Sequence, residues 1–282
     1  MSLTQYAIRI TQYVTCNMHR FFISPELIEG SEVLFPSDLA HQISRVLRLR
    51  EDDRVVILDN SDMEREVRLH SFSKRAVRGT VEALRQNRGE PRTYITLYMA
   101  LLKGKKLDVV FQKGTELGAS RFVPLVTQRS VVGFVEDLSD ARLDRWQAIV
   151  REAAEQSGRG RLPEVVDPLL FDVALAQART SQGVTLIPWE KGGKSLKSAL
   201  RPVEGRRPER INLFIGPEGG FEEDEILTAR AYGAIPVTLG PRILRAETAA
   251  IAALAAILYE LGEWEAGSVP EQDSATRDLA GL

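Results

Sequence analysis

The chain has 282 residues, of which 44% are hydrophobic and 27% are charged, values that exclude wholesale disorder and allow two globular domains. Its single cysteine, Cys16, excludes an internal disulfide, and His19, His41 and His70 are too scattered for a metal cage. The net charge is −2, no signal peptide is recognisable and no apolar run approaches the roughly 20 residues of a membrane span, so the sequence predicts a metal-free, non-membrane protein of the cytoplasm.

Residues 1–17 show no helical or strand period, and we expect them to form an N-terminal extension. From Met18 onward, short apolar stretches alternate with polar turn clusters, a pattern that predicts a small β-barrel over residues 18–90. The expected strands are 21–23, 33–35, 55–58, 67–69 and 76–81. One helix is expected over 38–47, with Leu39, Ile43, Val46 and Leu47 on one face.

Charge is unevenly distributed along the chain. Basic residues dominate from Arg65 to Arg92, whereas acidic residues dominate the end of the chain, including an expected acidic tail over 266–282. This asymmetry fits a polyanion-binding surface followed by a solvated end. Ordinary exposed charge is the alternative.

A polar segment over 86–91 marks the expected domain boundary, and strands and helices alternate beyond it. The expected strands are 94–101, 122–126, 184–187, 211–215 and 235–239. The expected helices are 105–117, one capped by Ser139 and ending near 157, 222–232 and 247–261. Continuous apolar strands separated by helices predict an α/β domain with a parallel sheet covered on both faces.

Glycine and proline follow three of these strands, over 188–190, 216–220 and 240–245, where open parallel sheets bind ligands. None of these segments fits a dinucleotide loop, and Pro188 stands where a phosphate loop ending in Gly193-Lys194-Ser195 would need its first glycine. Glu218 would also repel a phosphate. A phosphate-free cofactor such as S-adenosylmethionine fits better, with apolar residues around its adenine ring and a Gly219 that leaves space for the ligand. Glycines that merely form tight turns are the alternative.

Taken together, several motifs closely resemble the RsmE family, the small-subunit rRNA uracil-N3 methyltransferases of the SPOUT superfamily. The similarity covers roughly Met18 to Glu265, and residues 41–50 resemble the PUA-like domain of that family. Two departures are the leader before Met18 and Lys105-Lys106-Leu107, where the family often has an acidic residue. The motifs are Lys103-Gly104-Lys105, residues 112–118, Arg129-Ser130, Arg145-Trp146, and residues 152–159, 216–221 and 239–249.

The resemblance implies a trefoil-knotted α/β methyltransferase domain over 91–265, preceded by a PUA-like RNA-binding β-barrel over 18–90. It also implies a homodimer that acts on 16S rRNA, either free or in the assembled small subunit. The three strand exits would be knotted together into the cofactor pocket. The expected cofactor-binding residues are Leu186, Pro188, Glu190, Ile215, Gly216, Pro217, Glu218, Gly219, Leu239, Gly240, Ile243, Leu244, Arg245, Thr248 and Ala249.

Uracil N3 becomes nucleophilic as its proton leaves, and negative charge then develops on the flanking carbonyl oxygens. We expect Arg245 to stabilise that charge, with Glu247 as its catalytic partner; binding of an RNA phosphate and an ion pair with Glu247 are alternative roles for Arg245. Glu116, Glu190 and Glu218 are further possible proton acceptors. The expected RNA-binding residues are Arg20, His41, Arg45, Arg48, Lys113, Gln156 and Arg159.

Three other functions compete with this interpretation. A 2′-O-ribose methyltransferase would share the cofactor pocket, and a non-catalytic RNA-binding protein would lack cofactor binding. A nucleotide-dependent enzyme is disfavoured by the failed phosphate motifs.

Overall fold

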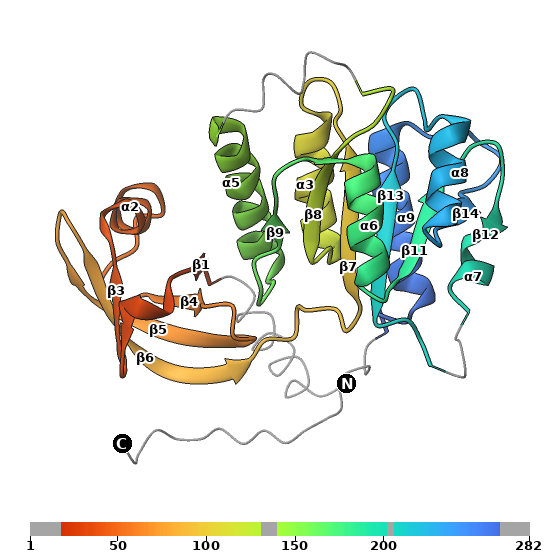
Figure 1. The fold of residues 1–282 in the computed structure, drawn as a ribbon. Coiled ribbons are helices and arrows are strands. Elements are labelled where there is room, and N and C mark those ends of the chain that lie inside the picture. The colour runs from red at the N-terminus through yellow and green to blue at the C-terminus, as the bar shows by residue number, and fades with distance from the viewer. Residues whose placement is uncertain (1–17, 131–139, 202–205, 266–282) are drawn as a thin grey trace. The chain divides into compact units, whose positions relative to one another are not determined.

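The computed structural model describes residues 18–130, 140–201 and 206–265. The chain forms two compact units, drawn in Figure 1. The first contains the chain up to Gly89 together with Gly158–Arg161, and the second contains Glu90–Ser157 and continues from Leu162. The expected N-terminal extension, the helix cap at Ser139 and the acidic tail lie outside the described residues.

The first unit contains a six-stranded sheet with the order β1-β4-β5-β6-β3-β2. Only the β1–β4 pair is parallel. Apolar side chains such as Phe21, Phe35, Ile57 and Leu69 fill the core of the unit. The strands are β1 (Arg20–Phe22), β2 (Ile28–Glu29), β3 (Glu32–Phe35), β4 (Arg54–Leu58), β5 (Met63–Phe72) and β6 (Val77–Gln86).

The expected helix over 38–47 is divided into two parts. A 3-10 helix, Pro25–Leu27, precedes α2 (Ser37–His41), and α2 continues directly into a π-helical turn, η3 (Gln42–Val46). The amide of Leu47 donates to the carbonyl of Gln42, five residues back, and this wider turn rotates the apolar face. Val46 is consequently 63% exposed, so the expectation that it shares a buried face with Ile43 is wrong.

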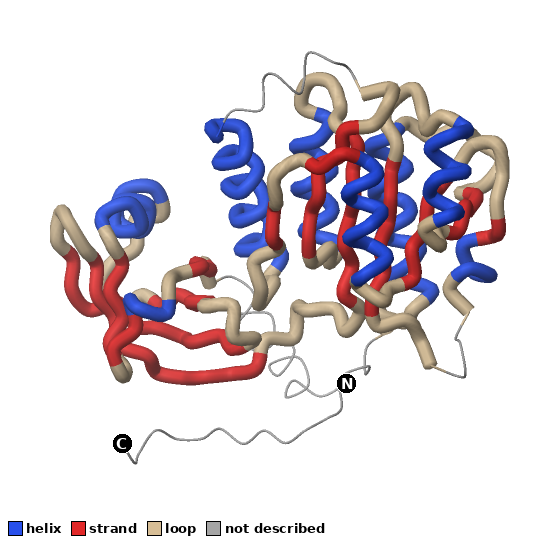
Figure 2. Tube along the Cα trace, viewed as in Figure 1, coloured by secondary structure: helices blue, strands red, loops and turns tan. Residues whose placement is uncertain are grey.

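The second unit is built on a parallel sheet, which confirms the expected α/β class. Its order is β10-β8-β7-β13-β11-β14-β12, with β9 paired to β8, and Figure 2 shows helices on both sides of it. The strands are β7 (Tyr94–Ala100), β8 (Arg121–Val126), β9 (Glu164–Val165), β10 (Leu169–Leu170), β11 (Val184–Pro188), β12 (Lys194–Ser195), β13 (Arg210–Ile215) and β14 (Ile235–Thr238).

Two hydrophobic clusters cover the two faces of this sheet. Leu213 and Ile215 of β13 belong to one cluster and Phe214 to the other, as the alternating direction of strand side chains requires. The first cluster contains residues of α3 (Lys106–Leu117), α5 (Asp140–Ser157) and α9 (Ala246–Glu260), and the second contains residues of α6 (Phe171–Thr180) and α8 (Glu223–Ala231). The short α7 (Leu196–Ala199) follows β12. Burial on both faces explains why the strands are continuous apolar runs.

None of the helices within the described residues is long and apolar enough to cross a membrane.

Candidate functional site

Three neighbouring strands bring the glycine- and proline-rich segments of the sequence together. β11 lies between β13 and β14, and all three are parallel, so their carboxyl ends meet at one edge of the sheet (Figure 1). The segments that follow them enclose a cavity of about 290 Å³. The cavity is lined by Pro188, Trp189, Glu190, Ile215, Gly216, Pro217, Glu218, Gly219, Gly220, Phe221, Thr238, Leu239, Gly240, Arg242, Ile243, Leu244, Ala246 and Ala249.

Most of the residues expected to bind the cofactor line this cavity, and three do not. Leu186 is fully buried in the hydrophobic cluster that contains α3 and α9. Arg245 is the N-cap of α9 and Thr248 lies in the first turn of that helix. The expectation missed Trp189, Gly220, Phe221, Thr238, Arg242 and Ala246, all of which lie within two positions of residues that it included.

The surroundings and backbone angles of the glycines in the site restrict which other residues could replace them. A Cβ at Gly216 would lie 3.1 Å from the ring of Phe221, and Gly220 and Gly240 have φ values of +71° and +102°, a region in which other residues are strained. The three atoms nearest to a Cβ at Gly219 all belong to Arg129, the closest at 3.1 Å. A side chain at position 219 would therefore meet Arg129; Gly219 also lines the cavity, and its expected role of leaving space for a ligand stays a prediction.

The lining fits a small, partly apolar ligand. Apolar residues such as Ile215, Leu244 and Ala249 line the cavity together with backbone of the glycine segments, the composition of a typical cofactor site. A side chain at Gly216 would press on the ring of Phe221, which would have to shift to make room. S-adenosylmethionine, with an adenine ring and polar ends, is a ligand of this chemical kind.

Glu218 is held as a carboxylate at the edge of the cavity. It accepts hydrogen bonds from Nζ of Lys106 at 2.9 Å and from the amide of Lys103 at 3.3 Å. Burial alone would raise the pKa of Glu218, but these bonds and the charge of Lys106 lower it below its ordinary value. A carboxylate with a lowered pKa is a weak proton acceptor, which disfavours the role of Glu218 as a general base.

Arg245 and Glu247 lie at the start of α9, beside the cavity. Arg245 is exposed, whereas one carboxylate oxygen of Glu247, Oε2, is buried and has no hydrogen-bond partner within the described residues. Over the same residues no ion pair joins Arg245 to Glu247. The alternative in which the two side chains neutralise each other is therefore not observed.

The residues expected to bind RNA have different environments. In the first unit, His41, Arg45 and Arg48 are exposed on and just after α2 and η3, whereas Arg20 lies 3.7 Å from Glu64. In the second unit, Lys113 donates to both oxygens of Glu116, the surface salt bridge that its spacing also allowed. Gln156 of α5 is exposed, whereas Arg159, which belongs to the first unit, is only 2% exposed.

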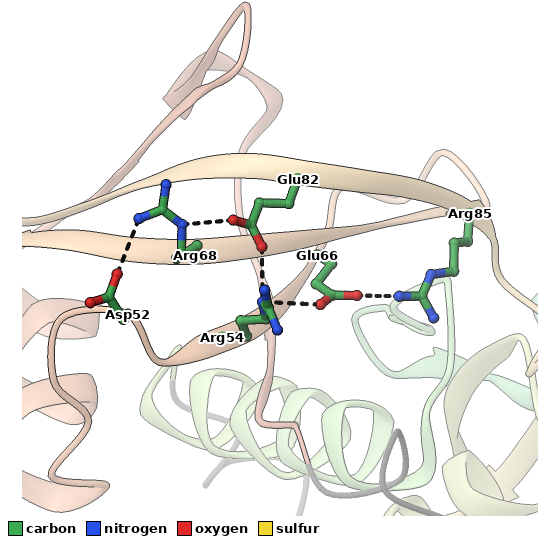
Figure 3. A network of polar contacts seen from close by, with 6 residues as sticks. All are labelled: Asp52, Arg54, Glu66, Arg68, Glu82 and Arg85. Atoms are coloured by element: carbon green, nitrogen blue, oxygen red, sulfur yellow. Dashed lines mark hydrogen bonds and ion pairs between the residues drawn. The ribbon is translucent and has the colours of Figure 1, made fainter. Parts of the chain in front are cut away.

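Much of the basic stretch is paired with acidic residues on neighbouring strands (Figure 3). Glu82 accepts from Nε of Arg54 at 2.8 Å and from Nε of Arg68 at 2.6 Å, and these bonds lower the pKa of Glu82. Arg68 also pairs with Asp52, and Glu66 pairs with Arg54 and Arg85. The stretch is therefore less able to attract a polyanion than its residue count indicates, because Glu66 and Glu82 within it and Asp52 before it pair with its arginines.

Comparison with known proteins places this architecture in a class. A family model described as an RNA methyltransferase domain matches residues 89–258, which include the strands and the cavity of the second unit. The sheet, its cavity and this match define an RNA methyltransferase.

Individual relatives are more specific. Ribosomal RNA small subunit methyltransferase E of Bacillus subtilis is 35% identical over 86% of this chain and 97% of its own length, and that of Synechocystis is 35% identical over 85% and 77%. The crystal structure of ribosomal RNA small subunit methyltransferase E from Neisseria gonorrhoeae bound to S-adenosyl methionine is 31% identical, with a TM-score of 0.76 over 86% of this chain and 98% of that one. The chain belongs to the ribosomal RNA small subunit methyltransferase E family.

Proposed function

We propose that the protein transfers a methyl group from S-adenosylmethionine to N3 of a uridine in 16S ribosomal RNA. The observation that carries this proposal is the cavity at the ends of β11, β13 and β14, in a chain of this family. The similarity to a relative bound to S-adenosyl methionine supports the choice of cofactor.

The residues around the cavity can hold this cofactor without any phosphate-binding element. Backbone groups of Gly216, Gly219 and Gly240 are available to the polar edges of the ligand, and Ile215 and Leu244 to its adenine ring. When bound, the cofactor supplies an electrophilic methyl group on its sulfonium. The chain itself has to exclude water, orient the base and stabilise the charge that develops on it.

Arg245 and Glu247 are our candidates for the catalytic groups. The guanidinium of Arg245 is exposed directly after the segment that lines the cavity, where it can donate to the oxygens beside N3. The buried oxygen of Glu247 has no hydrogen-bond partner within the described residues, and this unused acceptor makes Glu247 our candidate for the group that takes up the proton from N3 once the base is bound. N3 is buried in a base pair, so the target uridine has to be unpaired or flipped out of its stack.

The knot, the role of the first unit and the oligomeric state are part of the same proposal. A trefoil knot is supported by the sheet order, in which β13 lies between β7 and the earlier strand β11. A PUA-like role for the first unit is supported by the exposed His41, Arg45 and Arg48. We further propose that the protein acts as a homodimer in the cytoplasm, on free 16S rRNA or the assembled small subunit.

The test is methylation of 16S rRNA from a strain that lacks the enzyme, offered both free and as assembled subunits. Nucleoside mass spectrometry should detect N3-methyluridine, and the better substrate identifies the natural one. Methyl groups on the ribose would instead indicate a 2′-O-methyltransferase. If calorimetry detects no binding of S-adenosylmethionine, the protein is a non-catalytic RNA-binding protein.

A further inference from the structure

The glycine-rich segment after β13 is held from outside the cavity by an arginine at the end of another strand. Arg129 follows β8, and its guanidinium donates to the backbone carbonyl of Gly219 and to the carboxylate of Glu222. Arg129 is not among the residues that line the cavity. Any effect of this side chain on a bound ligand therefore acts through the segment.

The peptide group between Gly219 and Gly220 is fixed at both of its polar atoms. Its carbonyl oxygen accepts from Arg129, and its amide donates to the carbonyl of Pro217 at 2.9 Å. Glycine has more backbone freedom than any other residue, so a peptide between two glycines is the part of this segment that most needs external contacts. Of the two hydrogen bonds to this peptide, the one from Arg129 comes from the end of another strand, β8.

The side chain of Arg129 also crosses close to position 219. A Cβ there would lie 3.1 Å from Cδ of Arg129, closer than most such contacts. Gly219 itself does not have a positive φ, so the backbone would tolerate another residue. A side chain at 219 would instead have to displace the arginine that crosses it.

Resting on the proposed function, we propose that Arg129 is a positioning residue for the cofactor. It fixes the Gly219–Gly220 peptide before the ligand arrives, so that binding does not have to order two glycines. Arg129 therefore sets the affinity for S-adenosylmethionine, whereas the rate of methyl transfer from the saturated enzyme does not depend on it.

The first experiment measures the affinity of the full-length protein for S-adenosylmethionine by calorimetry. Arg129→Ala should bind about tenfold more weakly or worse, the effect of losing a hydrogen bond to a charged group. Its kcat at saturating cofactor should stay within about twofold of the unaltered value, because the lost contact is made equally before and during the reaction. The affinity of Arg129→Lys should lie between those of the unaltered protein and Arg129→Ala, since an ammonium group can reach the carbonyl of Gly219 but does not reproduce the fork that bonds Gly219 and Glu222 together.

Arg145→Ala is the matched control. Arg145 is also a half-exposed arginine paired with a carboxylate on another element, Asp108 of α3, but it does not contact the glycine segment. The affinity of Arg145→Ala for the cofactor should equal that of the unaltered protein. If the unaltered protein does not bind S-adenosylmethionine, the proposed function fails; if it binds and Arg129→Ala binds equally well, only the role of Arg129 is overturned.

A second readout needs no cofactor. Hydrogen exchange of the Gly220 amide should be faster in Arg129→Ala than in the unaltered protein, because the turn that protects this amide loses its external support. Unchanged exchange would contradict the proposal. If Arg129→Ala melts too low to be titrated, Arg129→Lys decides, and an affinity equal to that of the unaltered protein would overturn the inference.

A double-mutant cycle separates the contact with Arg129 from any direct effect on the cavity. Gly219→Ala should weaken cofactor binding by displacing Arg129, so it should have little further effect in the Arg129→Ala background. Additive losses would show that a side chain at 219 acts on the ligand directly, and would contradict the inference.

Discussion

At the start of α9, two ionisable residues that are neighbours in the sequence have opposite environments. Arg245 is exposed as the N-cap, whereas Glu247, in the first turn, has one buried and unpartnered carboxylate oxygen. An exposed guanidinium is free to meet a substrate that arrives from solution. This difference makes Arg245 the better residue on which to test the proposed chemistry.

We predict that Arg245→Lys lowers kcat by about 10²-fold or more, the loss seen when a donor to a developing oxyanion is removed, and leaves S-adenosylmethionine affinity nearly unchanged. Lysine keeps the positive charge but loses the planar pair of donors. Single-turnover methylation at saturating RNA and cofactor measures this directly. A near-normal rate, combined with a higher KM for RNA and greater salt sensitivity, would instead assign Arg245 to a phosphate.

Glu263 joins the end of α9 to the start of β7. Its carboxylate accepts from the amides of Arg92 and Thr93 and from the hydroxyl of Thr93, and it lies 3.1 Å from Arg207. Burial would raise the pKa of Glu263, but the bonds from Thr93 and Arg92 and the nearby arginines lower it. A lowered pKa means that the carboxylate stabilises the fold above its unfolded-state pKa and that this contribution is lost as pH falls through the folded-state value.

Glu263→Gln should therefore lower the free energy of unfolding at neutral pH by about 1–3 kcal/mol, because an amide cannot accept all of these bonds. The deficit should shrink as the pH falls through the lowered folded-state pKa of Glu263, because the native carboxylate then becomes protonated as well. Urea denaturation across this pH range measures both effects. Glu265→Gln, at an exposed position in the same segment, should change stability by less than about 0.5 kcal/mol; equal losses in the two variants would contradict the role of Glu263.

Among the structural elements, α8 depends on a buried acidic residue at its N-terminus. Glu225 accepts from the amide of Glu222 at 2.8 Å and from the amide of Gln128 at 2.9 Å, so it completes the capping box and connects α8 to the end of β8. It is only 4% exposed. The same segment after β8 carries Arg129, so this contact also helps to place the arginine.

We predict that Glu225→Gln lowers the free energy of unfolding by about 1–3 kcal/mol, because its amide nitrogen would face a backbone N–H that needs an acceptor. The melting temperature and urea midpoint measure the loss. Asp224→Asn, an exposed acidic residue in the same turn, should cost at most about 1 kcal/mol through the helix dipole. A larger loss for Asp224→Asn than for Glu225→Gln would contradict the capping assignment.

Elements with one or two buried faces were the ones predicted best from the sequence. Expectations for 211–215 and 247–261 match β13 and α9 closely, because apolar runs and alanine-rich periodicity are local signals. β5 and β6 extend to ten residues each, beyond their apolar windows, because charged pairs such as Arg68 and Glu82 occupy an exposed sheet face. α6 was missed; its N-cap is Leu170, without a side-chain cap, so no polar residue marks its start.

Site residues that directly follow a strand could be predicted from the sequence. Contacts that depend on the order of strands in the sheet could not. The segments after β11, β13 and β14 could be expected to converge because parallel strands end at one edge. Arg129 and Gly219 are 90 positions apart. No local pattern indicates that contact, which depends on β8, β7 and β13 being adjacent in the sheet.

For the whole molecule, we predict a homodimer at micromolar concentration. The exposed Ile243 beside the cavity, at 88% exposure, is a large apolar side chain of the kind that interfaces cover. Light scattering should give twice the chain mass of 31.4 kDa. A monomer mass would remove the shared-site part of the proposal, and Ile243→Asp should shift the equilibrium toward that monomer.

During synthesis, β7 gains its two sheet neighbours at very different times. β8 follows it closely in the chain, whereas β13 is made only after α5, α6 and β11. Residues 95–100 of β7 are all buried in the finished sheet, yet one edge of this strand has no partner until Arg210–Ile215 leaves the ribosome. An apolar edge in that state is a template for aggregation. The yield of natively folded protein should therefore depend on how this edge is protected before β13 is made. A chaperone that covers the edge, or the pace of translation before β13, should decide that yield.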